Sequence, residues 1–225
     1  MSETSKPVLA GLAAHWLGRI PFTDAVQRND LAVAQARASG VGQVLLFEPA
    51  AAVLTLGRRS QSPTGRAELT ETIALCAARG IAVVDADRGG LATLHAPGQL
   101  VVFVALPPPT PPIPALVCEL LRAARCAAGD IGAAAAIRAG ADAGLWLGPA
   151  KLGSVGLRIR DRCVLHGLSL NVALDSQLAA GLVLCGHGAA PFASMGEHSH
   201  DQRVRAAVRE ASVRFVEASR MRACA

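Results

Sequence analysis

The pattern of apolar and polar positions along the chain predicts a mixture of strands and helices. Short apolar runs bounded by glycine, proline or aspartate are typical of strands, whereas apolar positions that recur with a helical period are typical of helices. On this basis we expect helices over residues 23–40, 66–80, 115–129 and 201–220. Strands are expected over residues 43–48, 52–57, 81–87, 91–95, 99–106, 144–148, 153–160 and 163–172.

Local signals define the ends of several of these elements. Thr23 is placed to cap the first helix, and Gly40 and Gly80 are placed to end the first and second helices. The proline-rich stretch 107–114 is expected to be a stiff loop, because consecutive prolines cannot join a sheet ladder. The last two strands should pair antiparallel across residues 161–162. Strands interrupted by helices predict an α+β fold, with a mixed sheet and its helices on one side.

The length of 225 residues favours a single domain. We expect residues 1–15 to form a flexible N-terminal tail and residues 16–220 to form one catalytic domain. The longest apolar runs, such as residues 100–106, fall well short of the ~18 residues that a membrane span needs. The N-terminus also lacks the basic and apolar regions of an export signal. We therefore expect a cytoplasmic protein without a membrane partner.

Composition narrows the possible partners and cofactors. The net charge is +5, but aromatic residues make up only 3% and tyrosine is absent, so the stacking residues of a single-strand nucleic-acid binder are missing. We expect no nucleic-acid partner, and an acidic protein partner stays open. The six cysteines include no C-x-x-C pair, and the histidines of residues 198–201 have no further ligands at a fitting spacing. We expect no metal and no cofactor.

Three glycine-rich segments carry the candidate chemistry. Among 22 lysines and arginines, only Lys6 and Lys151 are lysines, and Lys151 lies among glycines within residues 148–156. An amine is favoured over a guanidinium where a group must release its proton. His95 lies between the glycines of residues 87–99, and Cys185 follows an apolar run and precedes a glycine. A thiol activated by a nearby cation is a plausible nucleophile, so Cys185 and Lys151 form a candidate pair.

The order of these motifs resembles that of the lipoyl(octanoyl) transferase family, in the biotin/lipoate protein ligase superfamily. The family pattern R-G-G-x-x-T-x-H-x-P-G-Q matches residues 88–99, and its lysine motif matches residues 151–156. The H-G-[FL]-[AS]-L-N motif matches residues 166–171, and the C-G motif matches residues 185–186. The T-L-G-R element of the family matches residues 55–58. Leu94, Ala96 and Leu184 stand where the family usually has tyrosine, glycine and proline.

The resemblance implies roles for particular residues. Cys185 would be the active thiol and Lys151 its activating lysine. The acyl-binding segments of the family correspond here to Arg88, Gly89, Gly90, Leu91, Ala92, Thr93, Leu94 and His95, to Ser154, Val155 and Gly156, and to Gly167, Leu168 and Ser169. The implied fold is a mixed, largely antiparallel sheet flanked by helices, like the catalytic domain of the ligases.

The activity that the resemblance implies is octanoyl transfer in lipoate biosynthesis. The donor would be octanoyl-acyl carrier protein. The acceptors would be lysines of the lipoyl domains of 2-oxoacid dehydrogenases and of the glycine cleavage H protein. An ATP-dependent lipoate ligase and an octanoyl amidotransferase are the alternative enzymes. A diverged, non-catalytic module that binds acyl groups or proteins is the alternative from another class.

Overall fold

The computed structural model describes residues 8–130, 132–140, 143–184, 191–196 and 201–220. Its helices are α1 (Phe22–Ser39), α2 (Pro63–Ala67), α3 (Thr70–Ala78), α4 (Ile113–Gly129), α5 (Ser176–Ala179) and α6 (Asp201–Arg220), with 3-10 turns η1 (Leu9–Gly11) and η2 (Arg58–Gln61). Its strands are β1 (Ala13–Ile20), β2 (Gln43–Pro49), β3 (Val53–Leu56), β4 (Ala82–Asp85), β5 (Ala92–His95), β6 (Gln99–Leu106), β7 (Ala136–Arg138), β8 (Gly144–Leu147), β9 (Ala150–Arg160) and β10 (Cys163–Asn171). Within these residues, no helix has both the length and the apolar character of a membrane span.

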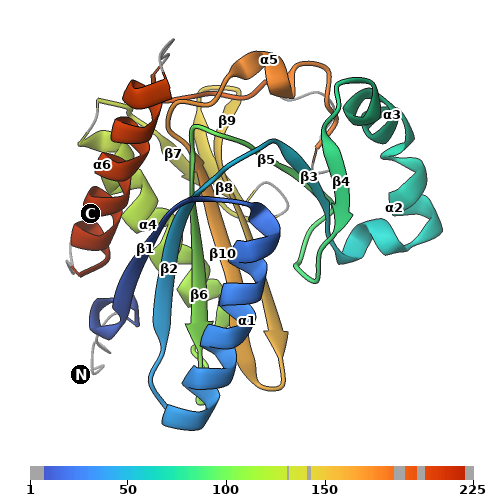
Figure 1. Cartoon of the computed structure of the whole chain (residues 1–225). Helices are drawn as coiled ribbons and strands as arrows, with labels where there is room; N and C mark the ends of the chain where they lie inside the picture. The colour runs from blue at the N-terminus through green and yellow to red at the C-terminus, as the bar shows by residue number, and fades with distance from the viewer. Residues whose placement is uncertain (1–7, 131, 141–142, 185–190, 197–200, 221–225) are drawn as a thin grey trace.

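The strands form two sheets. A seven-stranded sheet has the order β1-β2-β6-β10-β9-β8-β7, and a three-stranded sheet has the order β4-β3-β5. In the large sheet only β1 and β2 run parallel, and every other neighbouring pair is antiparallel. Figure 1 shows the small sheet beside the large one, with α2 and α3 at its outer side. The fold is therefore α+β with a mixed, largely antiparallel sheet, as expected.

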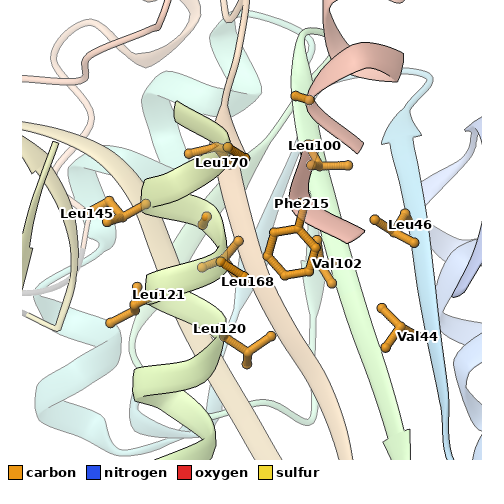
Figure 2. Close-up of a cluster of buried hydrophobic side chains, with 14 of the residues drawn as sticks. Val44, Leu46, Leu100, Val102, Leu120, Leu121, Leu145, Leu168, Leu170 and Phe215 are labelled. Carbon is orange, nitrogen blue, oxygen red and sulfur yellow. The ribbon is translucent and has the colours of Figure 1, made fainter. Parts of the chain in front are cut away.

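Helices cover both faces of the large sheet. Helix α1 buries one stripe of residues, which packs on the odd-numbered side chains of β6, namely Val101, Phe103 and Ala105. Helices α4 and α6 pack on the opposite face, over the even-numbered side chains of β6. In Figure 2, Phe215 of α6 lies beside Val102 of this strand, and Leu100 and Leu168 belong to the same buried cluster. Alternate residues of a strand point to opposite faces, so a strand that is apolar throughout, such as β6, needs cover on both sides.

The junction between the sheets is a tight turn. Strand β5 belongs to the small sheet and β6 to the large one, and residues Ala96-Pro97-Gly98 connect them. Gly98 has a φ of 87°, and a side chain there would overlap the backbone of Ala173. The buried carboxylate of Glu48 accepts a hydrogen bond of 2.9 Å from the Gly98 amide. The turn is thus anchored to the large sheet through β2.

Several expectations from the sequence differ from the structure. Strand β1 begins at Ala13 and pairs with β2, so residues 13–15 of the segment that we expected to be a tail belong to the large sheet. The helix expected over 66–80 is two helices, α2 and α3, separated at Leu69. Thr23 does not cap α1, because Pro21 occupies the N-cap position. The expectation that the helices lie on one side of the sheet was wrong, because the apolar strands of the large sheet are covered on both faces.

Candidate functional site

Two adjoining cavities lie where β5 of the small sheet faces β9 and β10 of the large sheet. The lysine cavity is lined by Ala92, Thr93, Leu94, Gln99, Trp146, Lys151, Ser154, Ser169, Asn171, Leu184 and Phe192. The histidine cavity is lined by Phe22, Ala86, Arg88, Thr93, His95, Val101, Phe103, Ser154, Val155, Gly156, His166, Gly167, Leu168 and Ser169. The space between their lining atoms is about 440 and about 370 Å³, which includes space open to solvent. Thr93, Ser154 and Ser169 line both, so the cavities share a wall.

Lys151 is a buried lysine at the start of β9. Its side chain is only 7% exposed, and its Nζ lies 5.2 Å from the centroid of the Trp146 ring, where the face of an indole favours a cation. Gly144 on β8 makes room for the amine's stem, because a Cβ there would come within 2.9 Å of the Lys151 Cε. The glycine that leaves space for the Lys151 side chain is thus Gly144, which lies outside the motif of residues 148–156.

The backbone around Lys151 is fixed by buried amides. The Lys151 N–H donates to the Pro191 carbonyl at 2.8 Å, and the Lys151 carbonyl accepts from the Ala193 N–H at 3.0 Å. The Asn171 carboxamide donates to the Lys151 and Ala193 carbonyls at 3.3 and 2.9 Å. Gln99 in turn donates to the Asn171 Oδ1 at 2.8 Å. This chain of bonds joins the start of β6, the end of β10 and the start of β9, so it holds the lysine against the cavity.

Two buried imidazoles define the other cavity. His95 at the end of β5 stacks on Phe22 with 4.5 Å between ring centroids, and His166 of β10 meets the edge of Phe103 at 5.4 Å. Burial lowers the pKa of His95 to about 3, and the positive charge of Arg88 contributes in the same direction. Burial and Arg88 likewise lower the pKa of His166 to about 4. Both rings are therefore uncharged near neutral pH, and they add polar atoms to a largely apolar wall without adding charge.

The ring nitrogens of His95 are buried without a protein partner. Both nitrogens, and the Nε2 of His166, make no hydrogen bond among the described residues. The Gln99 side chain lies near His95 and acts to raise the pKa of its ring, but the Gln99 amide group donates to the Leu94 carbonyl and to Asn171. A buried polar atom without a partner normally binds water or a ligand.

Arg88 forms the floor between the small sheet and the cavity. The side chain is 7% exposed and its Nη2 donates to the carbonyl and hydroxyl of Thr55 at 2.6 and 2.7 Å. Its Nη1 donates to the Gly89 carbonyl at 2.8 Å. The guanidinium therefore donates to oxygens of Thr55 on β3 and of Gly89, and these bonds tie the loop between β4 and β5 to the small sheet.

The structure brings together most of the residues that the sequence singled out. The residues that line one or both cavities are Lys151, Arg88, Ala92, Thr93, Leu94, His95, Ser154, Val155, Gly156, Gly167, Leu168 and Ser169. Gly89, Gly90 and Leu91 do not line them. Leu91 is buried in the core of the small sheet, and the Gly90 carbonyl lies so close to Gly57 that a Cβ on Gly57 would overlap it. Cys185 lies outside the described residues.

Several residues of the site lie outside the motifs of the sequence. Phe22 comes from the start of α1, Trp146 from β8, and Phe192 from a bridge beside Lys151. Aromatic residues are scarce in this chain, at 3%, and that scarcity was the only available signal. Leu94 and Leu184, which replace the tyrosine and proline of the family, both line the lysine cavity.

Comparison with known proteins assigns this arrangement to a class. The fold and site define an α+β domain with a buried lysine at the junction of two sheets. A family model described as the lipoyl protein ligase A/B catalytic domain matches residues 21–216. The chain belongs to this family.

Curated relatives and solved structures agree with the assignment. An octanoyltransferase of Deinococcus radiodurans is 32% identical over 183 residues, which cover 76% of this chain and 52% of the relative. One of Maridesulfovibrio salexigens is 36% identical over 142 residues, with coverage of 62% and 64%. The chain thus matches about half to two thirds of the length of these relatives.

The fold is shared with solved lipoate ligases. A lipoate-protein ligase A bound with ATP has a TM-score of 0.66 at 15% identity, with coverage of 92% of this chain and 85% of that chain. A bi-partite lipoate protein ligase of Thermoplasma acidophilum has a TM-score of 0.62 at 15% identity, with coverage of 92% and 84%.

Proposed function

We propose that the protein is an octanoyltransferase of lipoate biosynthesis. It moves an octanoyl group from octanoyl-acyl carrier protein to the lysine of a lipoyl domain, through a thioester on Cys185. The observation that carries the proposal is the buried amine of Lys151 in a cavity that shares a wall with a second, mostly apolar cavity. The names of the curated relatives support the same activity.

The surroundings of Lys151 support a pairing with Cys185. Leu184, which immediately precedes the cysteine, lines the lysine cavity. Phe192 lines the same cavity and forms a backbone bridge with Lys151. The described residues on both sides of 185–190 therefore lie at the lysine cavity.

The proposed reaction has two half-reactions. The thiolate of Cys185, stabilised by the Lys151 ammonium, attacks the thioester carbonyl of the donor, and the carrier thiolate leaves with the proton of the ammonium. This leaves an octanoyl-cysteine and a neutral Lys151 amine. The substrate lysine then attacks the new thioester, Lys151 accepts its proton, and Cys185 departs as thiolate. An amide replaces a thioester, so no ATP is consumed.

The acyl chain would extend from the lysine cavity into the histidine cavity. Thr93, Ser154 and Ser169 form the common wall. Phe22, Val101 and Phe103 give the second cavity an apolar lining suited to methylene groups. The proposed catalytic domain includes β1 through α6.

The proposed donor and acceptors are octanoyl-acyl carrier protein and the lipoyl domains of 2-oxoacid dehydrogenases and of the glycine cleavage H protein. An acidic carrier would be drawn to the net charge of +5, and transfer would then slow as salt screens the attraction. Arg58, Arg59 and Arg66 are exposed candidates for docking contacts, and Arg58 and Arg66 lie near Asp87 and Asp85 respectively.

The test is formation of an octanoyl adduct, measured by intact mass after incubation with octanoyl-acyl carrier protein. The adduct should form on the wild type without ATP and be absent from Cys185→Ser. Cys118→Ser is the matched control, because Cys118 is an exposed thiol on α4 that could be acylated non-specifically. An adduct that persists in Cys185→Ser and disappears in Cys118→Ser would refute the proposal, and transfer that requires ATP would indicate a ligase.

A further inference from the structure

His166 has an unusual backbone for a residue inside a strand. Its φ is 64°, in the left-handed region that residues other than glycine rarely adopt. Among the described residues, only two others outside glycine share a positive φ, Asp161 and Arg162, and they form the turn between β9 and β10. The turn explains those two, but His166 lies within β10, whose register with both neighbouring strands continues unbroken.

The left-handed conformation places the imidazole on the opposite face of the sheet. Val164 and Leu168, the even-numbered neighbours of His166, pack under α4 and α6. Val104, the partner of His166 on β6, packs there as well. Strand alternation would put the ring on that face. The ring instead meets Phe103 and lines the histidine cavity on the α1 face.

Asn29 of α1 holds this conformation in place. Its Oδ1 accepts a hydrogen bond of 3.0 Å from the His166 N–H. Its Nδ2 donates one of 2.9 Å to the carbonyl of Val104. The carboxamide therefore bridges two paired residues of β10 and β6, and the side chain is 1% exposed. A carboxamide offers a donor and an acceptor on separate atoms, which is what a bridge between an N–H and a carbonyl requires.

We infer that Asn29 is a positioning residue that sets the depth of the acyl-binding cavity. By holding the His166 backbone in its left-handed conformation, Asn29 keeps the imidazole on the cavity side of the sheet, where it occupies space that a longer acyl chain would need. The inference rests on the proposed function, since it assigns the histidine cavity to the acyl chain. Asn29 does not line either cavity and acts through His166.

The test compares acyl chains that end at different depths. Wild type and Asn29→Ala are incubated with butanoyl-, octanoyl- and dodecanoyl-acyl carrier protein, and the rate of adduct formation is measured. A butanoyl chain ends near the lysine cavity, so its rate should not change. The octanoyl rate should fall and the dodecanoyl rate should rise, which changes their ratio by about tenfold or more. An equal loss for all three chains would overturn the inference.

A double-mutant cycle separates positioning from a general loss of structure. His166→Gly removes the imidazole and tolerates the left-handed backbone, so it should shift the chain-length preference in the same direction. Once it is present, Asn29→Ala should add no further shift, whereas additive shifts would contradict the mechanism. Ser212→Ala is the control, because it removes a buried hydroxyl from α6, on the other face of the sheet, and should leave the chain-length preference unchanged.

Calorimetric binding of free octanoate and dodecanoate distinguishes this inference from the proposed function. If the wild type forms no adduct but Asn29→Ala shifts binding toward dodecanoate, the transfer proposal fails and the positioning role stands. If adducts form but neither binding nor transfer changes its chain-length dependence in Asn29→Ala, the positioning role fails and the transfer proposal stands.

Discussion

Acidification should destabilise the protein through the two buried imidazoles. Their pKa values are about 3 for His95 and about 4 for His166 in the folded chain, against an ordinary value of 6.5. As the pH falls below 6.5, the unfolded chain therefore binds protons that the folded chain does not. The stability that this difference provides is fully present above that pH and is lost as the pH falls toward the folded values.

The size of the effect follows from the width of the window. At about pH 4.5 each imidazole is two units below its unfolded pKa and still uncharged in the folded chain, and each unit is worth about 1.4 kcal/mol. Each histidine thus accounts for a loss of about 2.7 kcal/mol, and the two together for about 5 kcal/mol. Small domains are stable by only about 5–15 kcal/mol, so the loss should be large enough to measure.

Urea unfolding at about pH 7 and at about pH 4.5 measures this loss, and a variant isolates its source. In His95→Gln the amide does not titrate, so roughly half of the pH-dependent loss should disappear. Burial acts to raise the carboxyl pKa of Asp87, but Arg58 and Arg158 lower it overall. Its contribution to the pH dependence is the same in wild type and in His95→Gln, so it cancels when the two proteins are compared. An identical loss of stability in wild type and His95→Gln would show that the buried imidazole is not the cause.

Two substitutions test the packing around the site by urea unfolding. Gly167→Ala should lower the free energy of unfolding by about 3 kcal/mol, because a Cβ there would overlap a backbone carbonyl of β6. Gly129→Ala, at the open end of α4, is its control and should change that free energy by no more than about 1 kcal/mol. Equal effects of the two substitutions would contradict the close approach of the strands. Arg88→Met should lower the free energy of unfolding by about 3 kcal/mol, because the buried Thr55 carbonyl loses its guanidinium donor. Arg59→Met, on the surface, should lower it by less than about 0.5 kcal/mol. A small loss in Arg88→Met would show that the bond to Thr55 is replaceable.

Elements governed by local sequence could be predicted well. Helix α1 ends where Gly40 takes a φ of 74°, and β9 and β10 pair across residues 161–162 as expected. The signals for these features lie within a few residues of the features themselves. The apolar run of β6 indicated a buried strand, but a run without alternation does not say which layers cover it, so cover on both faces was missed.

Features that depend on distant residues could not be predicted. Strands β5 and β6 are separated only by Ala96-Pro97-Gly98 yet enter different sheets, and the carboxylate that anchors their turn comes from Glu48 on β2. Alternation along β10 predicts the wrong face for His166, because the bond that reverses it comes from Asn29, 137 positions earlier. Most residues that the motifs singled out line the two cavities, whereas Phe22 and Trp146, which also line them, lie outside the quoted motifs.

The three departures from the family pattern are compatible with an intact site. Ala96 is fully buried, and its φ is not among the positive values that would require glycine. Leu94 and Leu184 are 1% and 6% exposed and line the lysine cavity, where they stand in place of the tyrosine and the proline that the family usually has. These changes leave the Gln99 and Asn171 bonds that fix the Lys151 backbone in place. Because an apolar wall excludes water from a site where charges develop, such leucines strengthen the electrostatic interactions that a lysine and a thiolate would make there.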